Sequence, residues 1–517
     1  MLRFGSVVLA LVLSCAALLA NEGQLAVGGY VFVDENRNGV KDPGEKGLAG
    51  VSVSNQHQVV KTRADGTWTI EYQGPGSVYF VVKPRGFQSP MNEDNLPQFY
   101  YIDKPEGSPE GTKFAGVAPT GTLPRSIDFP LYPHEEPDAF RAIIFADTQP
   151  RDIREVEYIA HDVVEGLIGV EASFGVTLGD VAFDDLSVYG PLNAAIGLIG
   201  IPWYNVVGNH DLNLDSPDDE HSDETFERIY GPNYYSFDYG PTHFIVLDDV
   251  EFLAPGYKGG IGAKQMEWVK NDLAVVPDYQ LVVLMMHIPL RNVEDRQDLY
   301  RLIEKRPYTM SVSGHTHYQE HDFITAEDGW RGIEPHHHMI AVTVSGSWWG
   351  GAPNELGIPH TTMRGGAPNG YSVFSFDGHE YSIEFRAAGT PAGYQMNIYA
   401  PEETALADVS STPVFANVFG GSSESLVRAR VDDGDWVIMQ KVSKVDPVYA
   451  ESYERDKSQE RPFRGLPAPM KSRHLWEVSL GALFGGATPS VGTHMISVRT
   501  VDMFGQIYLS QRVLRVK

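Results

Sequence analysis

Trp-Tyr-Asn-Val-Val-Gly-Asn-His-Asp, residues 203–211, is the motif around which this 517-residue chain is organised. Its first half is a short apolar run of the kind that forms a buried strand. Its second half is a polar turn, which places an amide, an imidazole and a carboxylate side by side at the strand end. Taken alone, such a turn is as typical of an ordinary loop as of a functional site.

Four more apolar runs end in the same way, each in residues that bind metal ions. They are residues 143–146, followed by Asp147-Thr148-Gln149; 176–178, followed by Gly179-Asp180; 281–286, followed by His287; and 310–313, followed by Gly314-His315-Thr316-His317. With residues 203–211 they supply three carboxylates, two amides and four histidines. Ligands bind at strand ends in open α/β sheets, so we expect these side chains to meet in one site.

The five blocks, in this order, resemble the calcineurin-like metallophosphoesterase superfamily over residues 140–386. The resemblance implies a central α/β domain of four layers, in which two mixed sheets pack face to face and helices cover the outside. Strand runs alternate with helical ones along the chain, which agrees with such a core. Helices are expected after a capping pair formed by Asp152 and Glu155, over residues 263–273 and over residues 297–305.

The resemblance also implies a centre of two divalent metal ions. The first ion is held by Asp147, Gln149, Asp180 and His317, and the second by Asp180, Asn209, His287 and His315. Asp180 can bridge them because a carboxylate has two oxygens to share. A hydroxide that bridges the metals is the nucleophile, and His210 is the general acid that protonates the leaving group. Asp211 is expected to orient the imidazole of His210.

Two positions depart from the commonest pattern of the superfamily. Gln149 stands where most members carry histidine, although some branches do carry glutamine. Its neutral, hard oxygen favours manganese or magnesium, while zinc and iron stay open. Phe183 lies three residues after Asp180, where purple acid phosphatases carry a ligand tyrosine. Because phenylalanine has no oxygen to offer, a purple iron(III) centre is not expected.

A further motif is Gly-Ser-Trp-Trp-Gly-Gly, with Trp348 and Trp349 at its centre. Twin tryptophans beside glycines can form a flat wall for a sugar, base or acyl group, or they can pack one sheet against another from a strand. Arg364 can bind a phosphate oxygen or be a solvated loop charge. Asn369 and Tyr371 follow in a stretch that resembles a subgroup with an extra domain at each end, and all five are candidates for substrate binding.

The flanking regions read as β domains. Short strands separated by turn signals indicate a β-sandwich over residues 21–133 and a β-rich domain, also expected as a sandwich, over residues 390–517, on either side of a catalytic domain at residues 138–388. Residues 131–138 are expected to be a linker, and the polar residues 444–471 a long loop. The C-terminal domain is expected to pack on the catalytic domain, or to contact a glycan or the cell surface.

One loop of the N-terminal region fits a calcium-binding pattern. Oxygen-bearing side chains alternate, a glycine allows a sharp turn, and a glutamate follows that can bind through both oxygens. The candidate ligands are Asp34, Asn36, Asn38, Asp42 and Glu45. The alternative is a simple polar hairpin, since asparagine, aspartate and glycine are common in turns.

Residues 1–20 read as a signal peptide, with a basic start, a short apolar run and small residues before Asn21. The protein is therefore expected to be exported, either periplasmic or secreted. Cys15, the only cysteine, is expected to be lost on cleavage; the alternative is a lipid anchor. No later segment is apolar enough for a transmembrane helix. The net charge of -28 argues against nucleic acid and anionic membranes as partners.

Three functions remain open at this point. The first is an exported two-metal phosphohydrolase that cleaves phosphate esters. The second is a phosphodiesterase or pyrophosphatase acting on lipid or nucleotide head groups. The third is a surface binding protein whose central domain is inactive. The metal ligands cannot separate the first two, because both reactions use the same centre.

Overall fold

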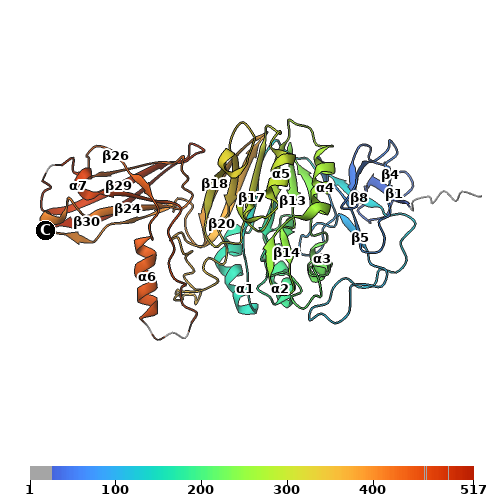
Figure 1. Ribbon diagram of the computed structural model, residues 1–517, viewed down its shortest axis with the longest axis horizontal. Coiled ribbons are helices and arrows are strands. Elements are labelled where there is room, and N and C mark those ends of the chain that lie inside the picture. Colours follow the sequence, from blue (N-terminus) through green and yellow to red (C-terminus); the bar gives the residue numbers. More distant parts are fainter. Residues whose placement is uncertain (1–25, 459, 461–462, 487) are drawn as a thin grey trace, which may run out of the picture.

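The computed structural model describes residues 26–458, 460, 463–486 and 488–517, which form an elongated molecule (Figure 1). An α/β region lies in the middle, and a β-rich region lies at each end. The predicted signal peptide, residues 1–20, and Cys15 fall outside the described residues. Among the described residues, no helix has the length and apolar character needed to cross a bilayer.

Two mixed sheets form the centre of the molecule. The first has the order β11-β10-β9-β20-β21 and the second the order β12-β13-β16-β17-β19-β18. Their strands are β9 (Ala139–Phe145), β10 (Phe174–Leu178), β11 (Trp203–Val206), β20 (Gly370–Asp377) and β21 (Glu380–Ala387), then β12 (Tyr235–Tyr239), β13 (Thr242–Val246), β16 (Leu281–Met285), β17 (Thr309–Ser313), β18 (Glu320–Ile324) and β19 (His336–Ile340). The strands that precede the polar blocks run parallel within each sheet.

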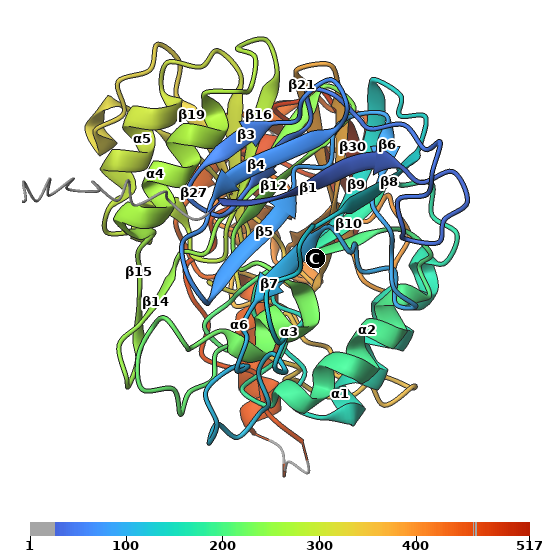
Figure 2. The same ribbon diagram turned by 90° about the vertical axis from the view of Figure 1, so that its right-hand side faces the viewer.

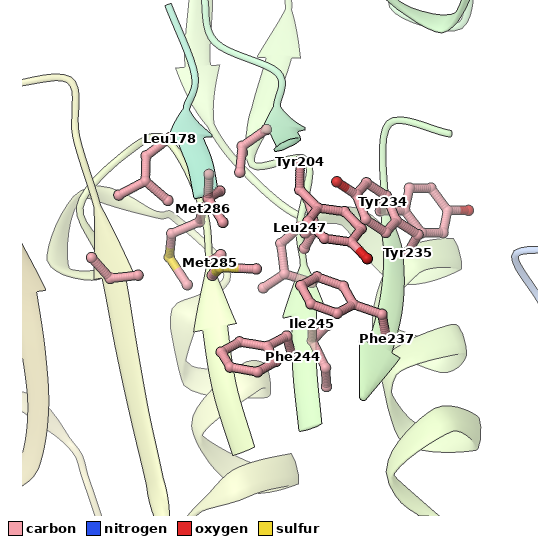
Figure 3. Close-up of a cluster of buried hydrophobic side chains, with 14 of the residues drawn as sticks. Leu178, Tyr204, Tyr234, Tyr235, Phe237, Phe244, Ile245, Leu247, Met285 and Met286 are labelled. Carbon is pink, nitrogen blue, oxygen red and sulfur yellow. The ribbon is translucent and has the colours of Figure 1, made fainter. Parts of the chain in front are cut away.

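Aromatic and aliphatic side chains from both sheets gather in one buried cluster (Figure 3). The ring of Tyr204 on β11 stacks on Phe237 of β12 with centroids 4.0 Å apart. Phe237 in turn lies 5.0 Å from Phe244 on β13. Such rings bury large apolar areas, so the apolar first half of residues 203–211 is fixed in the core and its polar second half is carried to the sheet edge.

Helices cover the outer faces of both sheets, which confirms the predicted four-layer fold. The helices are α1 (Ile153–Ile159), α2 (Tyr189–Gly197), α3 (Glu224–Tyr230), α4 (Gly262–Leu273) and α5 (Arg296–Ile303). Figure 2 shows α1 and α2 on one side of the molecule and α4 and α5 on the other. The side chain of Asp152 caps α1 by accepting the N–H groups of Arg154 and Glu155, whereas Glu155 accepts the N–H of Arg151.

The N-terminal region consists of two four-stranded sheets, β4-β1-β8-β6 and β3-β2-β5-β7. Their strands are β1 (Ala26–Val33), β2 (Ser52–Ser54), β3 (Val59–Lys61), β4 (Thr67–Glu71), β5 (Ser77–Val81), β6 (Phe87–Gln88), β7 (Tyr100–Asp103) and β8 (Phe129–Pro133). The prediction of a linker from residue 131 is wrong at its start, because Leu131 pairs with Val33 and belongs to β8.

This N-terminal sandwich shares its core with the catalytic region. Trp268 of α4 is fully buried, and its indole N–H donates to Ser54 Oγ at 3.1 Å. Lys83 is buried at the same junction and forms an ion pair with Glu136 at 2.5 Å. The two regions are therefore packed as one unit.

The C-terminal region is also a sandwich, with sheets β22-β24-β28-β27 and β23-β30-β29-β25-β26 around a separate core. Its strands are β22 (Met396–Tyr399), β23 (Glu403–Thr404), β24 (Pro413–Val418), β25 (Leu426–Val431), β26 (Val437–Ile438), β27 (Gln440–Val442), β28 (Leu475–Ser479), β29 (Gly492–Val501) and β30 (Ile507–Val516). It also contains the short helix α7 (Leu480–Leu483).

The predicted long loop at residues 444–471 is wrong, because it contains helix α6 (Pro447–Lys457). Asp446 caps this helix by accepting the N–H of Tyr449, and Pro447 occupies the first turn. Both are common helix-start residues, so the signal was present in the sequence.

His243 on β13 lies between two carboxylates, and this arrangement makes stability depend on pH. Its Nδ1 is 2.7 Å from Asp238 Oδ1, and its Nε2 is 2.8 Å from Asp272 Oδ2. Burial lowers the pKa of His243, but the two carboxylates outweigh burial and raise it to about 10. Because this folded pKa exceeds the unfolded value of about 6.5, the stabilisation is complete below pH ~6.5 and is lost as the pH rises through about 10.

Between pH 7 and pH 10 we therefore expect the free energy of unfolding to fall by roughly 2–4 kcal/mol. Urea denaturation at several pH values measures the change. His243→Gln has no titrating side chain at this position, so its free energy of unfolding should decrease less between pH 7 and pH 10 than that of the parent protein. His221→Gln is the matched control, since His221 forms an exposed pair with Asp218. The same fall in the His243 variant as in the parent would contradict this interpretation.

Candidate metal centre

The loops after β9, β10 and β17 hold their polar residues in an unusual backbone conformation. Non-glycine residues rarely adopt positive φ, yet Asp147 (46°), Gln149 (44°), Asp180 (47°), His315 (73°) and His317 (51°) all do. Such strain persists only where the surrounding structure imposes it, and it gathers at functional sites. These five residues are all predicted metal ligands.

Three of the predicted ligands converge on one atom of a fourth, His287 Nε2. It lies 3.1 Å from Asn209 Oδ1, 3.2 Å from Asp180 Oδ1 and 3.1 Å from His315 Nδ1. The other ring nitrogen, Nδ1, lies 2.9 Å from the carbonyl oxygen of Leu178. If Nδ1 donates to that carbonyl, the lone pair of Nε2 points at three further electron-pair donors.

The other predicted ligands lie around Asp147. Gln149 Nε2 donates to Asp180 Oδ2 at 2.7 Å, and His317 Nε2 lies 3.5 Å from Asp147 Oδ1. Gln149 Oε1 and His317 Nε2 are buried and have no hydrogen-bond partner within the described part of the chain. Buried polar atoms without a partner are costly, so both are expected to bind a group that completes the site.

These donors fit two divalent cations. Burial raises the pKa of Asp147 to about 8, and burial lowers the pKa of His317 to about 3. Burial lowers the pKa of His287 as well, but Asp180 and Asp147 reverse this and raise it to about 10. A neutral imidazole is the form that binds a metal. Without a metal, a proton on His287 compensates for the crowded donor atoms, and bound cations would take over that role. Asp180 lies between the two groups and contacts both.

Glycines make room for this crowding. A Cβ atom on Gly314 would lie 2.4 Å from Asp147 Oδ2. A Cβ atom on Gly179, which has a φ of +76°, would lie 2.4 Å from His287 Nδ1. Any side chain at these two positions would displace a predicted ligand.

The imidazole of His210 lies beside the ligands, but its partner is not the predicted one. His210 Nδ1 is 2.7 Å from Asp184 Oδ1, and the ring stacks on Phe183 at 4.2 Å. Burial lowers the pKa of His210, but the hydrogen bond with Asp184 and nearby carboxylates raise it above its ordinary value. Asp184, four residues after Asp180, was missed in the sequence because nothing local links it to His210.

The role predicted for Asp211 is wrong. Its buried carboxylate accepts the N–H groups of Val181, Ala182 and Gly208 and the hydroxyl of Tyr189. A carboxylate with four donors has no oxygen left to orient an imidazole. Asp211 instead ties the loop after β11 to the loop after β10, which brings Asp180 and Asn209 together.

The two tryptophans lie in a tight turn rather than in a strand, with φ of 55° for Trp348 and 54° for Trp349. Trp348 stacks on His317 with ring centroids 4.0 Å apart. Trp349 is buried, and its N–H donates to the carbonyl of Thr148 at 3.1 Å. Trp348 therefore lies at the site, whereas Trp349 packs behind it and offers no wall to a substrate.

The other predicted substrate residues make contacts elsewhere. Arg364 Nε donates to the carbonyl of Ala468 at 2.9 Å. The amide of Asn369 donates to Asp162 and to the carbonyl of Val344. Tyr371 on β20 packs with its ring centroid 6.0 Å from that of Phe145. The structure thus gives these three side chains packing roles and does not bring them to the ligands.

The five predicted calcium ligands meet within one loop. Asp34 accepts the N–H groups of Asn38 and Gly39, and Asp42 Oδ2 accepts the amides of Asn36 (2.7 Å) and Asn38 (2.9 Å). The carboxylate of Glu45 accepts the N–H groups of Glu35 and Asp42. Both the calcium site and the simple polar turn agree with these contacts, so the calcium site stays a prediction.

Comparison with known proteins places these observations in a family. The model for calcineurin-like phosphoesterase matches residues 141–319. The model for the N terminal of calcineurin-like phosphoesterase matches residues 35–118, and the one for its C terminal matches residues 338–508.

Two individual proteins are also similar to this chain. Serine/threonine-protein phosphatase CPPED1 of Pongo abelii is 30% identical over 109 residues, which are 20% of this chain and 34% of that protein. The match thus spans about a third of that relative's length. The structure of purple acid phosphatase PPD1 from yellow lupin (Lupinus luteus) seeds has a TM-score of 0.37 at 15% identity, covering 65% of this chain and 66% of that one.

The three family models follow one another along the chain and all describe parts of one kind of protein. The central one covers the strands and loops that carry all seven predicted ligands. The chain belongs to the calcineurin-like phosphoesterases, in the form that carries an additional N-terminal and an additional C-terminal domain.

Proposed function

We propose that this protein is an exported phosphohydrolase that cleaves phosphate esters at a two-metal centre. The observation that carries the proposal is the convergence of buried oxygen and nitrogen donors at His287 Nε2 and around Asp147. Two divalent cations, when bound there, supply an activated water as nucleophile and neutralise charge on the phosphoryl oxygens. Export rests on the signal-like composition of residues 1–20.

The chain's own groups divide the remaining work. Asp147, Gln149, Asp180 and His317 would hold one cation, and Asp180, Asn209, His287 and His315 the other. His210 would donate a proton to the leaving oxygen from Nε2, because its Nδ1 is held by Asp184 at 2.7 Å. This contact fixes the orientation of the ring and favours the protonated form, as a general acid requires.

The alternative functions differ in the substrate or in turnover itself. A phosphodiesterase or pyrophosphatase would use the same ligands. A surface binding protein would keep the fold without hydrolysis. The largely buried ligands and the Asp184–His210 pair favour an active centre, since a scaffold has no need of either.

Hydrolysis of a chromogenic phosphomonoester and of the matching phosphodiester, by metal-stripped protein reloaded with manganese, tests the proposal. Turnover that collapses in His210→Ala supports it. A preference for the diester moves the assignment to head-group or nucleotide cleavage. Full metal binding with no turnover of either ester favours the binding protein.

The calcium loop carries a separate prediction. At a calcium concentration about 100 times its Kd, binding to the folded state adds about 2.7 kcal/mol, which raises Tm by roughly 2–4 °C or more. Calorimetry with calcium or with a chelator measures the shift. Glu45→Gln should remove it and Glu93→Gln, an exposed acid on the same sandwich, should not. A calcium-independent Tm in the parent protein would identify the loop as a simple polar turn.

A further inference from the structure

Three imidazoles of the candidate metal centre each have an aromatic ring against them. Phe183 stacks on His210 at 4.2 Å, Trp348 stacks on His317 at 4.0 Å, and Tyr257 meets His315 edge to face at 5.9 Å. The rings come from three loops: one after β10, one after β19, and the hairpin of β14 (Val250–Phe252) and β15 (Tyr257–Gly259). No single packing interaction accounts for all three.

Phe183 is already covered on both faces. Its second face carries the guanidinium of Arg151, whose carbon lies 4.0 Å from the ring centre. Arg151 is in turn held by Glu155 and by the carbonyl of Trp348. This ring therefore packs between two side chains and has no face left for a substrate.

Tyr257 and Trp348 differ from Phe183 in this respect. Tyr257 is 41% exposed, and Trp348 is half-buried. Within the described chain, neither ring has an aromatic or cationic partner besides its imidazole.

The backbone fixes Trp348 at this position. Its φ of 55° is unfavourable for a tryptophan, and Arg151 donates to its carbonyl at 3.1 Å. Residues of the C-terminal region brace the same turn, since the N–H of Gly351 donates to the carbonyl of Arg464 at 2.8 Å. An indole held in this way can stack with little loss of freedom on binding.

We propose that Tyr257 and Trp348 form an aromatic pair that flanks the metal centre and selects phosphate esters whose leaving group carries a planar ring. The phosphoryl group is recognised by the polar centre whatever is attached to it, so selection must come from groups beside the centre. His315 and His317 are two residues apart, which puts the two rings beside the same turn. Flat aromatic surfaces favour a planar ring over a puckered one of similar size.

The inference rests on the proposed function, because the rings would contact the leaving group of that reaction. Its test uses two non-hydrolysable ligands, benzylphosphonate and cyclohexylmethylphosphonate, which share the phosphonate and differ in whether the ring is planar. Calorimetry on manganese-loaded protein gives both affinities without any turnover. We expect about 25-fold tighter binding of the benzyl ligand by the parent protein, of which each ring contributes about five-fold.

Tyr257→Leu and Trp348→Leu should each weaken benzylphosphonate binding about five-fold and change the affinity of the cyclohexylmethyl ligand by less than about two-fold. Tyr257→Phe keeps the ring and should keep the preference, and Tyr279→Leu, 76% exposed, is the remote control. Metal content is measured in each variant, because Trp348 contacts the ligand His317.

An equal affinity of the parent for both phosphonates, binding of neither, or variants that weaken both ligands equally would overturn the inference. The last result would mean that the rings only hold the imidazoles in place. Failure of the proposed function is read separately. A ring preference without hydrolysis of benzyl phosphate would reject the phosphohydrolase and keep the aromatic pair. Hydrolysis without a ring preference would keep the phosphohydrolase and reject the aromatic pair.

Discussion

Replacing Asp180 by asparagine is expected to lower kcat/KM for phosphate-ester hydrolysis on the order of 10³-fold or more and to remove at least one bound metal. The carboxylate is 1% exposed, and its two oxygens contact His287 Nε2 and Gln149 Nε2. Asparagine keeps the shape but has one oxygen instead of two and no charge, so it cannot bridge two cations. Steady-state kinetics and elemental analysis of the same sample measure both effects.

Asp152→Asn is the matched control for this substitution. Asp152 caps α1, and asparagine is an equally good cap, so activity and metal content should both be unchanged. Circular dichroism establishes that each variant is folded. Near-normal turnover by Asp180→Asn would show that Asp180 does not bridge two metals.

Replacing His210 by alanine is expected to lower kcat by about 10²–10⁴-fold with both metals retained. A general acid matters most when the leaving group is a poor one. The loss should therefore be larger for an alkyl phosphate than for a nitrophenyl phosphate, whose leaving group departs readily without a proton. Comparing kcat for these two esters in parent and variant measures the difference.

Asp184 supplies the controls for the same experiment. Asp184→Ala removes the partner of His210 Nδ1 and should reproduce the leaving-group pattern with a smaller loss, about ten-fold. Asp184→Asn keeps an acceptor oxygen and should lose less. An equal loss for both esters in His210→Ala would contradict the role of His210 as acid.

The convergence of the predicted ligands could be anticipated from the sequence because each of these side chains follows an apolar strand run. Residues 203–211 show why: the strand half is fixed by the rings of the core, so the turn half has to appear at the sheet edge. The family blocks then identify which strand ends belong together. Strand β8 and the capped helix α6 have comparable local signals in the sequence, although the predictions for these segments are a linker and a loop.

The partner of His210 could not be predicted in this way. Asp211 is its neighbour in the sequence, but four hydrogen-bond donors occupy its oxygens. Asp184 comes from another loop and reaches His210 only through the pairing of β10 with β11. The position of Tyr257 could not be predicted for a related reason, since the hairpin of β14 and β15 brings it to His315 only through tertiary contacts.

The three adjacent histidines of β19 also owe their environment to tertiary contacts. His336, His337 and His338 are all buried. Their rings bond to Ser311, Ser313, His321 and Tyr381. Burial lowers the pKa of each, to about 3 for His336 and His338 and about 4 for His337. They therefore serve as neutral hydrogen-bonding groups of the core.

Titration of metal-stripped protein with manganese, followed by ester hydrolysis at each step, tests whether the protein works through a two-metal centre. We expect two ions to bind per chain, with turnover that appears as the second site fills, because the nucleophile and the phosphate both require the complete centre. Two bound ions without hydrolysis of any phosphate ester, or full activity in the stripped protein, would contradict it.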